Sequence, residues 1–170
     1  MGMTLRRLGY GIAAILLVCT VTAARAESPS ISIVEFGEYR TDAGQERIAE
    51  RTVSGIIKDV SLVEHIKQTD VIFGQLTNSF GIRYTLHGDF DASAGLVHRT
   101  IHPPLTNPKT GKVSTISEYD GIIGGNRVNV YRGFTFDDRW ELAEGEWAFQ
   151  IFYKGQLMAE KKFKVVIPLN

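Results

Sequence analysis

The sequence predicts an all-β protein, built as an antiparallel β-sandwich of seven to nine strands. Short runs in which apolar and polar residues alternate recur along the chain, and turn signals separate them every 8–15 residues or so. The repeated alternation of strand and helix that is typical of a doubly wound fold does not occur. These two observations together favour two stacked sheets.

The end of the chain carries the clearest pattern. Trp147, Phe149, Ile151 and Tyr153 occupy alternate positions and therefore face one side of a strand. After the turn Lys154-Gly155, the odd positions continue as apolar residues with Lys161 as the one break: Leu157, Ala159, Phe163, Val165 and Ile167. Two such runs joined by a two-residue turn predict a hairpin. Because an isolated hairpin is only marginally stable in water, its aromatic side must pack on a second sheet.

The remaining strands are expected upstream of this terminal hairpin. A first strand over Ile31 to Tyr39 is followed by a turn or loop at Thr41 to Gly44. Phe80, Ile82, Tyr84 and Leu86 alternate with Gly81, Arg83, Thr85 and His87, which predicts a strand with one apolar face. Two further strands are expected over Leu96 to Ile101 and over Val113 to Tyr119, and the turn Asp120-Gly121 ends the second of them. The turn Gly124-Gly125-Asn126 precedes another strand. The apolar residues on one face of that strand are Val128, Val130, Phe134 and Phe136.

Residues 46–67 have two interpretations. A helical stripe fits the apolar residues Val53, Ile56, Ile57, Val60, Val63 and Ile66. Gly55 lies inside that stripe and would cost about 1 kcal/mol relative to alanine. The alternative is a strand with Val60, Leu62 and Glu64 on one face and Ser61, Val63 and His65 on the other. We favour the strand, because all the downstream patterns are β.

Residues 1–26 have the pattern of a cleaved signal peptide. Arg6 and Arg7 precede an apolar run from Gly11 to Val21, which is too short for a membrane span of about 20 residues. Ala24-Arg25-Ala26 supplies a small-x-small cleavage site, so we predict cleavage after Ala26 and a single domain over residues 27–170. The expected location is therefore periplasmic or secreted.

The composition of the mature chain excludes several classes of protein. Cys19 lies in the predicted signal peptide, so no disulfide and no thiol catalysis are expected after cleavage. Removing Arg6, Arg7 and Arg25 leaves 16 of the 19 basic residues against 19 acidic ones, a net charge of −3. This charge argues against a nucleic-acid-binding protein. No second long apolar stretch is present, so no transmembrane segment is expected in the mature chain.

Residues suited to catalysis or metal binding do not form a recognisable motif. His98 and His102 would lie about 13 Å apart on a strand, too far for one metal ion, and we interpret them as surface histidines. Asp89 and Asp91 lack the spacing of a calcium loop. There is no G-x-S-x-G elbow and no phosphate-binding or dinucleotide-binding glycine motif. We therefore expect no catalytic residue, no metal and no cofactor.

The stretch from His102 to Lys112 is the most distinctive loop. Pro103-Pro104 stiffens the backbone, and Asn107, Pro108 and Lys109 suit a type I turn that Gly111 ends. A rigid loop loses little entropy on binding, which favours recognition. The candidate binding residues are Pro103, Pro104, Leu105, Thr106, Asn107 and Lys109. The alternative is a purely structural connection held between the two sheets.

Three segments together resemble a family of small exported bacterial proteins of unknown function. They are Phe80 to Tyr84, the loop from Pro103 to Gly111, and Gly145-Glu146-Trp147 followed by Ile151 to Gly155. The resemblance covers most of the mature chain and implies an immunoglobulin-like sandwich, but it supplies no activity and no catalytic residue. The chain lacks the paired cysteines of immunoglobulin domains.

We predict a non-enzymatic binding or accessory module of the cell envelope, whose partner is a protein or another envelope component. The partner would meet the 102–112 loop or pair with an exposed strand edge. Two alternatives are kept: a small hydrolase that uses loop carboxylates with His87 or His102, and a structural subunit of an envelope assembly.

Overall fold

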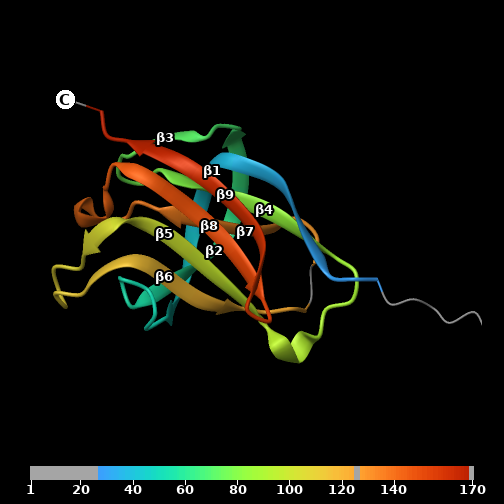
Figure 1. Cartoon of the computed structure of the whole chain (residues 1–170). Coiled ribbons are helices and arrows are strands. Elements are labelled where there is room, and N and C mark those ends of the chain that lie inside the picture. The colour runs from blue at the N-terminus through green and yellow to red at the C-terminus, as the bar shows by residue number, and fades with distance from the viewer. Residues whose placement is uncertain (1–26, 125–126, 169–170) are drawn as a thin grey trace, which may run out of the picture.

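A computed structural model describes residues 27–124 and 127–168, and it confirms the all-β sandwich. One sheet has four strands in the order β2 (Ile56–Lys67), β1 (Ser30–Ile48), β4 (Ser79–His87) and β7 (Val130–Thr135). The other has five, in the order β3 (Val71–Phe73), β9 (Gln156–Val166), β8 (Gly145–Tyr153), β5 (Leu96–Thr106) and β6 (Val113–Gly121). Figure 1 shows both sheets and two single-turn 3₁₀ helices, η1 (Ala92–Ala94) and η2 (Arg139–Glu141). The predicted signal peptide and most of the turn Gly124-Gly125-Asn126 lie outside the described residues.

The terminal hairpin forms as predicted and supplies the centre of the core. Trp147, Phe149 and Ile151 of β8 have no exposed surface. Lys154 and Gly155 have φ angles of 48° and 77°, as a type I′ turn requires at its two central positions. The ring of Phe80 in β4 lies 5.6 Å from Trp147 and 5.4 Å from Phe149, centroid to centroid. The aromatic side of the hairpin therefore packs on the second sheet.

The predicted alternation fails at one point in β9. The pairs Ile151↔Ala159 and Phe152↔Leu157 enclose a bulge at Met158, which shifts the side-chain parity by one residue. Leu157 consequently shares the outer face with Phe152 and is 45% exposed, whereas Phe163 and Val165 are buried as expected. Lys161 does keep the inward parity, and its Nζ lies 3.5 Å from the centre of the Phe36 ring.

The predicted turn at Thr41 to Gly44 is wrong, because β1 continues through it to Ile48. The chain stays paired with β2 here, and register shifts between Asp42 and Glu46 accommodate the irregular backbone. Residues 56–67 form a strand, so the strand interpretation of this ambiguous segment is correct. The predicted shared face of Val60 and Leu62 does not form, because a bulge at Ser61 separates them. Leu62 pairs with Asp42 and Val60 with the next residue, Ala43, so the two side chains point to opposite faces.

The later strands are found where they were expected, with changed ends. β6 includes Asp120 and Gly121, which were predicted to form a turn. Phe136 is fully buried just beyond β7, whereas Val128 precedes the strand and is 53% exposed. β9 is an edge strand only in part, because β3 pairs with it in parallel at its last three residues.

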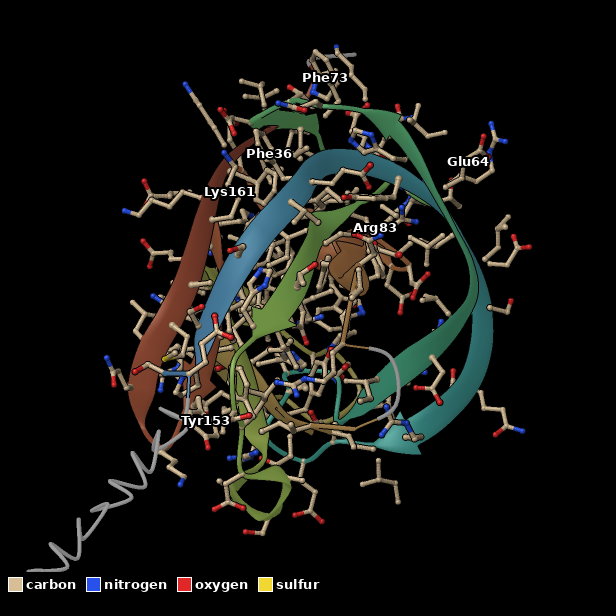
Figure 2. All side chains as sticks on the ribbon, turned by 90° about the vertical axis from the view of Figure 1, so that its right-hand side faces the viewer. Phe36, Glu64, Phe73, Arg83, Tyr153 and Lys161 are labelled. Atoms are coloured by element: carbon tan, nitrogen blue, oxygen red, sulfur yellow. The ribbon has the colours of Figure 1, made fainter. Side chains whose placement is uncertain are left out.

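The β1–β2 ribbon extends beyond the four-stranded sheet and arches over its outer face, as Figure 2 shows. Its far end reaches the edge of the other sheet, where the backbone N–H of Glu118 in β6 donates to Arg51 O over 3.1 Å. Arg51 also forms an ion pair with Asp120. The arch therefore links the two sheets on the side where β6 ends the second one. Within the described part of the chain, no helix is long and apolar enough to cross a bilayer.

Candidate functional site

The predicted binding loop divides into the end of a strand and a short turn. Residues 102–106, expected in the loop, belong to β5, which has a register shift between Ile101 and Leu105 where the two prolines lie. Proline is tolerated there because a bulge leaves backbone N–H groups outside the ladder. Leu105 is 1% exposed and packs in the core. Only residues 107–112 form the connection to β6.

Asn107 is the buried centre of this turn. Its Oδ1 accepts the backbone N–H of Lys109 over 2.9 Å and of Thr110 over 3.3 Å, and its backbone O accepts the N–H of Gly111 over 2.8 Å. Gly111 has a φ of 70°, which other residues rarely adopt. Asn107 Nδ2 donates over 3.2 Å to the carbonyl of Val53, in the connection between β1 and β2. One side chain thus shapes the turn and fixes it to a distant loop.

A lysine reinforces the same link. Lys112 Nζ donates to Glu50 O over 2.6 Å and to Thr52 O over 2.7 Å, on the same β1–β2 connection. Of the predicted binding residues, Leu105 and Asn107 are buried and Pro103 is half-buried. Pro104, Thr106 and Lys109 are exposed and remain available for contact. We call these three exposed residues, with the turn 107–112 that carries Lys109, the loop end.

The interpretation of His98 and His102 as surface residues is wrong, because both point into the sandwich and are 6% and 3% exposed. His98 Nε2 lies 2.9 Å from the Tyr84 hydroxyl. His102 Nδ1 lies 2.8 Å from the Pro103 carbonyl, which can only accept, so Nδ1 carries the hydrogen. Burial lowers the pKa of His98 to about 3, and it lowers the pKa of His102 as well.

His102 and Ser117 form a hydrogen-bonded pair, with 3.1 Å between Nε2 and Oγ. Since Nε2 of this tautomer is an acceptor, the Ser117 hydroxyl donates to it. Ser117 Oγ accepts in turn from the backbone N–H of Val53 over 3.2 Å. A serine next to an unprotonated imidazole is the arrangement of an activated nucleophile. Here the serine is only 7% exposed, so the pair ties β5, β6 and the Val53 loop together.

The loop carboxylates have structural partners. Asp91 Oδ1 accepts the backbone N–H of Ser93 over 3.0 Å at the start of η1, and its Oδ2 lies 3.3 Å from Lys154 Nζ. Asp137 forms a 2.9 Å ion pair with Lys58 of the arch. His87 and Asp89 are exposed. Residues 27–124 and 127–168 contain no group of three or more His, Cys, Asp or Glu side chains that could hold a metal ion.

Glu141 is the one buried carboxylate of this set. It is 7% exposed, and its Oε2 accepts the backbone N–H groups of Asp137 over 2.8 Å and Asp138 over 3.0 Å. Burial raises the pKa of Glu141 to about 7, against the two hydrogen bonds, which lower it. The folded state therefore binds the proton of the Glu141 carboxyl more tightly than the unfolded chain does. The protonated carboxyl stabilises the fold below about pH 4.5, and this stabilisation is lost as the pH rises through 7.

The structure assembles one polar cluster that the sequence analysis missed, on the outer face of the four-stranded sheet beneath the arch. Glu35 Oε1 lies 3.3 Å from Arg83 Nη1, and Glu35 Oε2 lies 3.5 Å from His65 Nδ1. Arg83 Nη2 donates to Val63 O over 2.5 Å, which holds β2 against the sheet. Figure 2 shows Arg83 beneath the arch. The predicted outward parity of Arg83 was the only sequence signal for this cluster.

Two tyrosines complete the cluster. The rings of Tyr39 and Tyr131 lie 4.9 Å apart, and Tyr39 is only 3% exposed although it is on an outer face. Burial, and then the Glu35 carboxylate, raise the pKa of Tyr39 above its ordinary value. A Cβ on Gly133 would lie 1.9 Å from the Tyr131 hydroxyl oxygen, so glycine is required for this ring to lie on the sheet. The cluster acts as a second small core that fixes the arch.

Arg132 lies inside the sandwich. Its Nη2 donates to Thr100 Oγ1 over 2.6 Å, and its guanidinium carbon lies 4.6 Å from the centre of the Tyr119 ring and 5.3 Å from that of Phe149. The side chain is 8% exposed, and its positive charge helps to lower the pKa of His98. Uncharged oxygens and aromatic faces thus stabilise the guanidinium.

The surface of the described part of the molecule includes the following two grooves. One has a volume of about 590 Å³ and lies along the start of β8 and the end of β9, with Asp70, Lys161 and Glu146 in its walls. The other has a volume of about 510 Å³ and lies between the arch and β6, with Arg51, Tyr119 and Asp120 in its walls. Ion pairs join Lys161 to Asp70 in the first groove and Arg51 to Asp120 in the second.

The two sheets and their strand order are those of an immunoglobulin-like β-sandwich. A solved structure supports this class: an immunoglobulin-like protein from Pseudomonas aeruginosa superposes with a TM-score of 0.63 at 21% sequence identity, over 84% of this chain and 100% of that one. The chain belongs to the family described as a domain of unknown function, DUF3859, whose profile matches residues 27–165. No curated protein matches the chain.

Proposed function

We propose that this protein is an exported, non-enzymatic binding or accessory module of the cell envelope, and that the loop end is its recognition surface. The observation that carries the proposal is the fixation of the loop end by Asn107 and Lys112 on the β1–β2 connection. A loop end fixed in this way presents Pro104 and Thr106 at the end of β5, and Lys109 in the turn, in one geometry. Little conformational entropy is then lost when a partner binds.

Export to the periplasm or the medium is part of the same proposal. It rests on the basic, apolar and small-residue segments that end at Ala26. N-terminal sequencing of protein recovered from outside the cytoplasm tests it. We expect Glu27 as the first residue, and an intact Met1 would contradict the proposed cleavage.

The binding proposal is tested by photo-crosslinking in the cells that produce the protein. A photoreactive amino acid replaces Thr106 in one variant, and in the control it replaces Ser93, which is exposed at the opposite end of the sandwich. We expect a discrete crosslinked species from position 106 only. Lys109→Ala should weaken it, and Lys154→Ala, in the turn between β8 and β9, should leave it unchanged. Equal crosslinking from both positions, or none from position 106, would contradict a specific loop end.

A small hydrolase is the second candidate, because His102 and Ser117 are hydrogen-bonded as a base and a nucleophile would be. Burial of both side chains favours the structural role. The assay is hydrolysis of a chromogenic ester by the purified protein, with Ser117→Ala as its control. Hydrolysis that Ser117→Ala abolishes would favour a hydrolase over a binding module. Equal background rates for the unmodified protein and the variant would favour the binding module.

A further inference from the structure

β2 is attached to the sandwich without a buried side chain of its own. None of its 12 residues is buried, whereas most of β4 and β8 is. The chain is nevertheless fixed on both sides of this strand, because Val53 before it and Ile72 after it belong to the core and are 3% and 0% exposed. We call β2, residues 56–67, the strap. Apolar packing holds the chain at both of its ends but not along its middle.

The backbone ladder between the strap and β1 is irregular. Three register shifts interrupt it between Glu38 and Glu46. Each shift leaves at least one residue without a partner in the ladder. In the described part of the chain, the strap is the outermost strand of its sheet and β1 is the one strand that pairs with it. A segment with few buried contacts and an interrupted, exposed ladder opens at a lower free energy than the core strands.

Ion pairs tie the strap to its surroundings. Lys58 Nζ lies 2.9 Å from Asp137 Oδ2, in the connection between β7 and β8, and the two side chains are 33% and 42% exposed. Two further pairs, with more exposed side chains, join the strap to β1: Arg40–Glu64 and Arg47–Asp59. Exposed ion pairs contribute little free energy each and are screened by salt. The attachment of the strap should therefore depend on ionic strength.

The polar groups beneath the strap are incompletely satisfied while it is closed. Arg83 Nη2 donates to Val63 O of the strap, and Figure 2 shows Arg83 beneath the strap and Glu64 on its outer side. Within the described residues, Glu35 Oε1 and the Tyr39 hydroxyl are buried and have no hydrogen-bond partner. A buried polar atom without a partner costs free energy, which is recovered when water reaches the atom. This cost favours opening.

We propose that the strap opens as one unit while the rest of the sandwich stays folded, and that its closure depends on charge. Opening uncovers the ring of Tyr39 and the guanidinium of Arg83, so the strap controls access to these two side chains. The loop end is not part of this device. Val53, whose carbonyl accepts from Asn107, lies before the strap and stays in the core. This proposal and the proposed recognition surface can therefore fail independently.

Amide hydrogen exchange of the purified protein, measured by mass spectrometry, tests the opening. The exchange is compared at about 0.02 M and about 0.5 M NaCl, between which the Debye length falls from about 20 Å to about 4 Å. We expect peptides that cover residues 56–67 to exchange roughly threefold to tenfold faster at the higher salt concentration, because the three ion pairs are weakened. Peptides from β8 and from residues 107–112 should exchange at the same rate in both solutions.

Two matched lysine variants isolate the contribution of one ion pair. Lys58→Met removes the pair with Asp137 and keeps an apolar side chain of similar length. The control, Lys162→Met, removes a pair with Glu146 that has nearly the same distance, 3.0 Å, but joins β9 to β8. At the lower salt concentration, we expect Lys58→Met to speed exchange of residues 56–67 about twofold to fivefold, and Lys162→Met to leave it unchanged.

Four results would overturn the proposal. Exchange of residues 56–67 as slow as that of β8 would mean that the strap opens only when the whole protein unfolds. Exchange of the strap that does not change with salt would remove the dependence on charge. Equal acceleration in all strands, or equal effects of the two lysine variants, would mean that salt and charge act on the whole fold. If Lys58→Met does not fold, the salt dependence measured on the unmodified protein decides between these outcomes.

Discussion

Asn107→Ala is the substitution that tests the fixed loop end most fully. The change removes the donor to Val53 O, at 3.2 Å, and the acceptor of two turn N–H groups. Lys109 and Thr110 are exposed, so water can satisfy their N–H groups. Val53 is only 3% exposed, so its carbonyl is left without a partner at a cost of about 1–3 kcal/mol.

The loss should appear directly in thermal and urea unfolding. A cost of about 2 kcal/mol lowers the Tm of a domain of this size by roughly 5–8 °C. Lys109→Ala is the matched control, because it alters an exposed side chain of the same turn and should change stability by no more than about 0.5 kcal/mol. An Asn107→Ala variant as stable as this control would refute the idea that Asn107 fixes the turn.

Three further predictions concern stability. Glu141→Gln keeps an acceptor for the N–H groups of Asp137 and Asp138 but cannot ionise. The free energy of unfolding of this variant, relative to that of the unmodified protein, should therefore rise by up to about 3 kcal/mol between pH 4 and 8, and a pH-independent difference would contradict this. The pKa of the His98 imidazole is lowered in the fold, so its contribution to the free energy of unfolding is present above about pH 6.5 and is lost towards pH 3. His98→Gln should therefore lower the pH midpoint of acid unfolding. An unchanged midpoint would count against this role of His98. Phe149→Ala should cost about 3–5 kcal/mol in urea unfolding, since the ring is fully buried among Phe80, Phe163 and Arg132, and a cost below about 1 kcal/mol would place the ring outside the core.

The sequence predicted those parts of the fold in which one period holds along a whole strand. In β4 and β8 the apolar residues keep strict alternation, so the buried faces could be assigned without knowing the partner strands. The errors at Thr41 to Gly44, at Leu157 and at Pro103-Pro104 all occur at register shifts. In a bulge, two residues of one strand lie opposite a single residue of the neighbouring strand. The sequence of one strand alone therefore cannot predict it.

The candidate site was predicted only where it is local. Asn107 was recognised as a turn residue, because its contacts to Lys109 and Thr110 depend on near neighbours. Its bond to Val53 spans 54 positions and depends on the path of the arch. The cluster around Glu35 joins β1, β2 and β4, so it depends on the strand order, which the alternation of side chains does not determine.

The proposed recognition requires a loop end that is ordered before any partner binds. Native-state hydrogen exchange of the Gly111 amide tests it most directly, since this N–H donates to Asn107 O over 2.8 Å in a turn that is otherwise at the surface. We expect strong protection of this amide in the isolated protein and the loss of that protection in Asn107→Ala. Exchange of Gly111 at the rate of an unstructured peptide would contradict it.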